Sequence, residues 1–276
     1  MQLTEASYFS PHIQREFASV SQVKRFMECE AAALAEIRGD YKIETTNAML
    51  VGSYVDAFFS HTLGQFSAEH PQIYTNRGEL RADFRQAQEI IALIQSDPLL
   101  MAMMEGEQQK IVTGEIYGVP FRGKLDVLVS ADSCREIAAL YPEMAEELML
   151  ADGAIVDLKI MRDLEPVWVP GAGRMSFVQA WRYDLQLAIY QHLLGQRLPC
   201  YLVVATKEKV PDKALIHIPQ YMLDAALKAA ESAIKRTDYL KHHPEDAEPC
   251  GRCEWCKTTK VISGAIDADE LEGVSI

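Results

Sequence analysis

Two apolar segments of the chain each carry an aspartate, and the second also carries a lysine two positions later. They are GKLDVLVS, with Asp126, and IVDLKI, with Asp157 and Lys159. Side chains alternate between the faces of a strand, so Asp157 and Lys159 are expected on one face and Leu158 on the other, packed face. Carboxylates are the hard ligands that Mg²⁺ or Mn²⁺ prefers, and the carbonyl oxygen of Leu158 is a further candidate ligand. The spacing favours metal-assisted attack of water on a phosphate, with the lysine holding the water or stabilising the developing charge.

The plainer interpretation of the same residues is structural. A D-x-K triplet occurs by chance in many proteins, and Asp157 and Lys159 then belong to a solvated strand face while Asp126 ends a turn. The surrounding elements must decide between the two interpretations.

Hydrophobic periodicity predicts a mixed β-sheet flanked by helices around these residues. Short alternating segments predict strands at residues 111–117, 121–130, 153–160, 200–206 and 214–218. Apolar residues at helical spacing predict helices at residues 19–38, 48–64, 79–105, 177–194 and 222–240. The expected fold class is α/β, of the α+β type. We expect one domain over residues 1–276, divided into a helical part at 1–110, the sheet core at 111–220, and a helix with a cysteine tail at 221–276.

Composition restricts the possible functions. Hydrophobic residues make up 49% of the chain and charged residues 24%, as in an ordinary globular protein. The chain does not begin with a basic stretch followed by an apolar run, and no run of about 18 apolar residues occurs, so we expect a cytoplasmic protein without a membrane partner. The net charge of -13 argues against nucleic-acid binding over the whole surface, but it leaves room for a local basic groove and fits clustered metal-binding carboxylates.

Near the end of the chain, three of its six cysteines form a C-x2-C-x2-C pattern. Cys250, Cys253 and Cys256 can converge from a single tight loop, which is typical of metal binding. Structural zinc sites usually present two pairs of ligands, so a triplet with one remote partner favours a [4Fe-4S] cluster. Cys29 is then the fourth ligand.

Other ligand sets remain open for the tail. If the metal is zinc, His217, His242 or His243 could replace Cys29. Four reduced cysteines without metal are the plain alternative. Cys134 and Cys200 each stand alone and are expected to bind no metal.

The ordered motifs resemble the PD-(D/E)XK nuclease superfamily, in particular its RecB-like and phage-type exonucleases, over most of the chain. The matching segments follow in order: VSQVKRFMECEAAAL, GSYVDAFF, GKLDVL, IVDLKI and YDLQLAIYQ. The resemblance implies a restriction-endonuclease-like core in which Asp126 and Asp157 bind the metal and Lys159 is the catalytic lysine. It also implies that Gln186 and Tyr190, as a Q-x-x-x-Y element, orient substrate or water. Without that resemblance, these two residues are equally well explained as a polar stripe on an amphipathic helix.

The chain departs from the superfamily in its first motif, where a histidine usually stands four residues after a glycine. Here Gly52 is followed by Asp56, which keeps a metal ligand, for example for a second cation, but changes its hardness and leaves metal number and preference open. Tyr183 is a further expected neighbour of the site. We interpret Glu115 as a surface charge of the preceding strand and His61 as a helix-end residue.

The arrangement of one cysteine near the start and three near the end also resembles that of the iron-sulfur nucleases of this superfamily, which include CRISPR-associated and helicase-linked members. In those relatives the cluster joins the two ends of the fold. They usually have a wider spacing before the last cysteine, so the compact interval between Cys253 and Cys256 leaves the cluster type open.

The sequence thus predicts a Mg²⁺- or Mn²⁺-dependent exodeoxyribonuclease of phage or prophage type, acting on double-stranded ends or single strands of DNA in recombination or repair. A single-strand annealing protein as partner and an oligomeric state are both compatible with it. The alternative of a different class is an iron-sulfur or zinc DNA-binding module with a degenerate nuclease site, which Asp56 and the acidic charge favour. A redox protein, which has no need of Asp126, is the third possibility.

Overall fold

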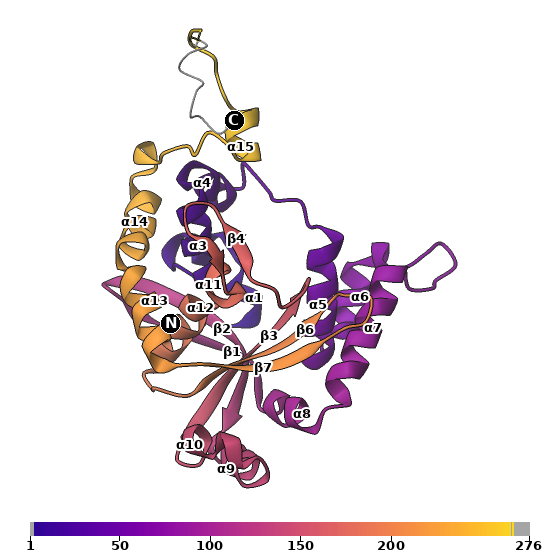
Figure 1. The fold of residues 1–276 in the computed structure, drawn as a ribbon. Coiled ribbons are helices and arrows are strands. Elements are labelled where there is room, and N and C mark those ends of the chain that lie inside the picture. Colours follow the sequence, from indigo (N-terminus) through magenta and orange to yellow (C-terminus); the bar gives the residue numbers. More distant parts are fainter. Residues whose placement is uncertain (1–2, 266, 268–276) are drawn as a thin grey trace.

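The computed structural model describes residues 3–265 and residue 267. Its centre is a five-stranded sheet in the order β1-β2-β3-β6-β7 (Figure 1). The strands are β1 (Glu107–Ile116), β2 (Val119–Ser130), β3 (Gly153–Met161), β6 (Cys200–Thr206) and β7 (Lys213–Ile218). β3 and β6 are parallel and the other neighbours are antiparallel, so the sheet is mixed. The predicted strands and the α/β class are confirmed.

Helices cover both faces of this sheet (Figure 1). One apolar cluster joins the sheet to α5 (Asn47–Phe59), α7 (Ala82–Gln95), α8 (Pro98–Met104) and α9 (Ala131–Leu140). A second cluster joins the other face to α3 (Val20–Glu28), α11 (Phe177–Ala180), α12 (Tyr183–Leu194), α13 (Gln220–Ala229) and α14 (Glu231–His242). Every residue of β6 is buried, as expected for a strand that is covered on both faces.

Several predicted helices are wrong in their continuity. The segment 19–38 is divided into α3 and α4 (Glu30–Arg38) by Cys29, whose backbone is extended, with φ -164° and ψ 110°. The segment 177–194 is divided before α12 by Arg182, which has a left-handed φ of 56°. The segment 222–240 is divided at Ala230. In each case the apolar spacing continues across a change of direction, so periodicity alone does not reveal the break.

The helix predicted over 48–64 also ends earlier than expected. α5 stops at Phe59, and Gly64 lies inside the next helix, α6 (Leu63–Glu69), so it is not the terminator. His61 has a left-handed φ of 60°, which matches its interpretation as a helix-end residue. The predicted helical region 79–105 is confirmed as α7 and α8, separated where Pro98 begins the second helix.

Periodicity does not predict the shorter elements. They are α1 (Glu5–Tyr8), α2 (Pro11–Glu16), α10 (Ala145–Leu148), α15 (Glu254–Thr258), the 3-10 turns η1 (Pro71–Ile73), η2 (Pro142–Met144) and η3 (Pro244–Asp246), and the hairpin of β4 (Val167–Val169) and β5 (Gly173–Met175). The hairpin forms a separate two-stranded sheet inserted between β3 and α11. Within the described residues, no helix has both the length and the apolar character needed to cross a bilayer.

Candidate active site and cysteine site

The two central aspartates lie where strands β2 and β3 separate. The last paired residues are Val127 and Val156, so the next positions on the two antiparallel strands are Asp126 and Asp157. Beyond this point a side chain takes the place of a backbone hydrogen-bond partner: Oδ2 of Asp126 accepts a hydrogen bond of 2.9 Å from the backbone N–H of Leu158. The divergence of the strands opens room between them while it keeps both carboxylates at one level of the sheet.

Asp157 is buried and held from two sides. Its side chain is 1% exposed, and Oδ1 accepts a hydrogen bond of 2.7 Å from Nε2 of Gln186 on α12. Oδ2 forms an ion pair with the Lys159 ammonium and has no hydrogen bond of acceptable geometry within the described part of the chain. The predicted sharing of one strand face by Asp157 and Lys159 is therefore present, with Leu158 buried among the apolar residues of the opposite layer.

Burial and like charge dominate the electrostatics of this centre. Burial raises the pKa of Asp126 well above its usual value, and the negative charge of Asp157 raises it further. Burial also raises the pKa of Asp56 on α5, against the opposing charges of Lys124 and Lys159. The pKa of Lys159 is raised because its carboxylate neighbours outweigh its burial, so the lysine stays protonated at neutral pH.

The donor set fits a divalent cation. Two carboxylates that repel each other in a largely buried setting are stabilised when a cation lies between them. Asp56 stands somewhat apart from Asp126 and Asp157. Within the described residues, only four cysteines bring three or more metal-ligating atoms within 4.8 Å of one another, so these three carboxylates do not form such a group. Oδ1 of Asp56 instead accepts a hydrogen bond of 3.3 Å from Nε2 of Gln109.

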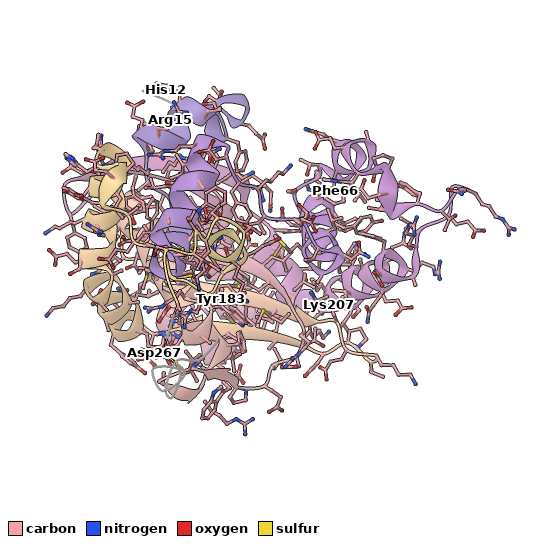
Figure 2. All side chains as sticks on the ribbon, turned by 90° about the horizontal axis from the view of Figure 1, so that it is seen from above. His12, Arg15, Phe66, Tyr183, Lys207 and Asp267 are labelled. Carbon is pink, nitrogen blue, oxygen red and sulfur yellow. The ribbon has the colours of Figure 1, made fainter. Side chains whose placement is uncertain are left out.

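A cleft of about 1190 Å³ opens onto this centre. Asp56, Asp126 and Lys159 line it on one side, and residues of the β4–β5 hairpin and of α11 line it on the other. Tyr183 also lines it, with its ring centroid 5.2 Å from Nζ of Lys159, as the sequence led us to expect. Figure 2 labels this Tyr183 on α12 and also Lys207, which lies just beyond β6 and is a further residue of the cleft wall.

The Q-x-x-x-Y residues of α12 face the site as a pair. Nε2 of Gln186 lies 3.2 Å from the hydroxyl of Tyr190, and burial raises the pKa of that hydroxyl well above its usual value. The close approach of α12 requires Gly123, because a Cβ there would lie 3.0 Å from the Tyr190 ring. This explains the glycine of the GKLD segment.

Lys24 on α3 is a site neighbour that the sequence reasoning missed. Its Nζ donates a hydrogen bond of 3.4 Å to Oε1 of Gln186 and lies 5.2 Å from the centroid of the Tyr183 ring. Burial lowers its pKa to about 8, and the charge of Lys159 lowers it further. In the sequence it is one charge among several on an amphipathic helix, so no local signal marks it. Glu115, by contrast, is exposed on β1 and lies outside the cleft.

The four predicted cysteines converge. The sulfurs of Cys29, Cys250, Cys253 and Cys256 all lie within 4.8 Å of one another, with 3.5 Å between Cys29 and Cys256. Backbone N–H groups donate to three of the sulfurs, and those of Arg252 and Cys253 lower the pKa of Cys250 to about 6. Four converging sulfurs, three of them with such donors, fit a metal, since thiolates are the ligating form.

The extended backbone of Cys29 explains the helix break, because it turns this side chain toward the tail, where α15 lies beside α4 (Figure 1). The alternative histidines point elsewhere: His217 lies against Tyr201, and His243 stacks on Tyr239. Cys134 and Cys200 are buried apart from the quartet, and burial raises their pKa values to about 11 and about 12.

The sheet, the opposed carboxylates and the D-x-K strand define a protein of the PD-(D/E)XK class. The sequence model of one family, the PDDEXK-like domain of unknown function (DUF3799), matches residues 19–135 and 144–259, so the chain belongs to that family. The chain is also similar to a protein from Eubacterium rectale described as a candidate exonuclease. Its crystal structure is 34% identical in sequence, with a TM-score of 0.86 and 99% of each chain covered. No curated protein matches the sequence. The family and this neighbour confirm the resemblance and support a nuclease.

Proposed function

We propose that the chain is a single-domain, metal-dependent exodeoxyribonuclease that hydrolyses DNA phosphodiesters in recombination or repair, of the phage or prophage type. The observation that carries the proposal is the pair of carboxylates Asp126 and Asp157 beside a protonated Lys159. Asp126 and Lys159 line an open cleft, and Asp157 is buried next to them. The similarity to a protein from Eubacterium rectale that is described as a candidate exonuclease adds support.

Each residue of the candidate active site has a separate role in the proposed reaction. Asp126, Asp157 and the carbonyl oxygen of Leu158 would hold Mg²⁺ or Mn²⁺, which when bound neutralises charge on the phosphate and acidifies water. Lys159 holds the attacking water or stabilises the charge that develops on the phosphate oxygens; its raised pKa makes it a cation rather than a base. Gln186 keeps Asp157 in position through its 2.7 Å hydrogen bond, and Tyr190 supports Gln186.

We further propose that the cysteine quartet holds a metal that joins the two ends of the chain. One zinc ion bound by four sulfurs at about 2.3 Å needs sulfur–sulfur separations of about 3.8 Å. The separations of 3.5 Å from Cys29 to Cys256 and 3.9 Å from Cys250 to Cys256 are of that size. A [4Fe-4S] cluster places each sulfur on a different iron and needs a wider arrangement. The separations thus favour the zinc alternative, while the C-x2-C-x2-C spacing favours the cluster; absorbance and metal content of anaerobically purified protein distinguish them.

The test of the nuclease uses linear double-stranded and single-stranded DNA with Mg²⁺ or Mn²⁺. We expect degradation by the wild type and none by Asp157→Ala or Lys159→Ala. Glu115→Ala is the matched control, because it removes an exposed carboxylate of a neighbouring strand outside the cleft and should leave the rate unchanged.

If the wild type degrades neither substrate although its cysteine site is loaded, the nuclease proposal is wrong. Binding of DNA without cleavage would then support the second candidate, a DNA-binding module with a degenerate site. The aspartate at position 56 is the observation that favours this candidate.

A further inference from the structure

Two exposed tryptophans line the cleft beside the candidate active site. Trp168 is 70% exposed and Trp181 is 51% exposed, and both belong to the cleft wall that also contains Asp126 and Lys159. The remaining tryptophan, Trp255, packs in the cysteine tail, with its ring centroid 5.5 Å from that of Tyr41. Two of the three tryptophans of the chain are therefore presented to solvent at one place.

Packing does not explain these two side chains. Trp168 lies in the middle of β4, a three-residue strand of the hairpin that Figure 1 shows standing off the central sheet. A tryptophan stabilises a fold by removing its large ring from water, and a ring that is 70% exposed contributes little in this way. Exposed aromatic rings in a cleft are instead typical of a binding surface.

Cations accompany the rings. Arg174 is the cross-strand partner of Trp168, so the two side chains stand on the same face of the hairpin, and both line the cleft. Lys207 also lies on the cleft wall and has no ion pair within the described part of the chain, where its Nζ donates to the carbonyl oxygen of Ala48. Arg174 lies 3.9 Å from a carboxylate oxygen of Glu165, in an exposed ion pair. Rings with neighbouring cations are the combination that binds a single nucleic-acid strand, because bases stack on the rings and phosphates meet the cations.

We propose that Trp168 and Trp181 bind the unpaired nucleobases of a single DNA strand and lead its backbone to Asp126 and Asp157. This inference rests on the proposed nuclease function and specifies its substrate as single-stranded. In a duplex the flat faces of the bases are covered by their neighbours, except on the outer side of the two terminal pairs, so bases within the duplex are not free to stack on a side chain. Along the chain, the hairpin and the short helix α11, which precedes Trp181, connect β3, the strand of Asp157, to α12, the helix of Gln186. Both rings line the same cleft as Asp126.

Binding is measured in an Asp157→Asn background, so that the strand is not cut. Quenching of tryptophan fluorescence reports the Kd of a short oligothymidylate and of the same strand annealed to its oligoadenylate complement, at one fixed ionic strength. We expect tighter binding of the single strand, and about 10-fold weaker binding after Trp168→Ala or Trp181→Ala. Binding to the variants is followed by the anisotropy of a dye on the oligonucleotide, and Trp255 supplies an unchanged fluorescence background.

Three further variants separate stacking from general effects. Trp168→Phe should retain most of the affinity, whereas Trp168→Leu should lose as much as Trp168→Ala, because only a ring can stack. Tyr221→Ala removes an aromatic residue that is 73% exposed on α13, away from the cleft, and should change nothing.

The inference is overturned if both tryptophan variants bind the single strand as the parent does, or if the parent prefers the duplex. These results leave the nuclease proposal intact when Asp157→Ala still abolishes cleavage. Conversely, tryptophan-dependent binding by a wild-type chain that cuts no DNA would refute the nuclease and keep the binding site.

Discussion

Replacing Asp126 by asparagine should stabilise the metal-free protein while it abolishes cleavage. Asp126 is half-buried beside Asp157 on the cleft wall, and both burial and that neighbouring charge raise its pKa. Asparagine keeps an oxygen to accept the 2.9 Å hydrogen bond from Leu158, and its amide replaces a repulsive oxygen by a donor. Removal of this half-buried charge, which Lys159 and the N–H of Leu158 compensate only in part, is worth on the order of 1–3 kcal/mol in the free energy of unfolding. This corresponds to an increase of about 2–10 °C in Tm for a chain of this size.

The pH dependence of that gain has a defined sign. A carboxyl group whose pKa is raised on folding holds its proton more tightly in the folded state, so it lowers stability as pH rises from the unfolded value of about 3.9 through the folded value. The difference between Asp126→Asn and wild type should therefore be small in acid, grow across that window, and then stay constant at higher pH.

Thermal unfolding in buffer without added divalent cation, repeated with Mg²⁺, measures both effects. Mg²⁺ should raise the Tm of the wild type and have little effect on Asp126→Asn, because the variant has lost a ligand and the repulsion that the cation relieves. Zinc and iron are determined in every sample, so that loss of the cysteine-bound metal is not mistaken for an effect at the active site. A variant that is less stable than wild type at neutral pH, or that responds equally to Mg²⁺, would refute this account of the carboxylate pair.

Three other substitutions test the parts that surround the centre. Gly123→Ala places a Cβ 3.0 Å from the Tyr190 ring, so it should cost about 1–3 kcal/mol in chemical unfolding and lower kcat by displacing α12. Lys24→Met should lower kcat, because the side-chain oxygen of Gln186 loses its donor. In a pH–rate profile the wild-type rate should fall as pH rises through about 8, when Lys24 loses its proton. Lys24→Arg should not show this fall. Cys29→Ser should reduce the bound zinc or iron and lower Tm, whereas Cys134→Ser should leave the metal content unchanged.

The sequence predicts the strands of the candidate active site well, because the periodicity that indicates them is contained in short segments. Alternation within IVDLKI places Asp157 and Lys159 on one face, and the structure has them there as an ion pair. The cysteine quartet was also predictable. Three thiols at close spacing need one more ligand, and Cys29 lies in VSQVKRFMECEAAAL, the first segment that resembles the superfamily. In both cases a short segment contains most of the information.

What escaped prediction depends on contacts between distant segments. Cys29 interrupts a continuous apolar stripe because its partners lie more than two hundred residues later, and nothing within α3 or α4 reports them. Lys24 reaches Gln186 only after α3 is placed on the sheet. The separation of β2 and β3 at Asp126 is likewise a property of the pairing register, which single-strand alternation does not contain.

Helix α3 connects the cysteine site with the active site. Its first end is held by β2, because Ala18 pairs with Phe121 and accepts a hydrogen bond of 2.9 Å from the N–H of Arg122. Its last residue precedes Cys29, so a metal in the cysteine quartet holds its other end against the tail. Lys24 stands between these two anchors and donates to the glutamine that positions Asp157. Because a hydrogen bond of this kind is sensitive to shifts of less than 1 Å, a metal bound at the cysteines would influence the proposed catalytic carboxylate, Asp157, without touching it.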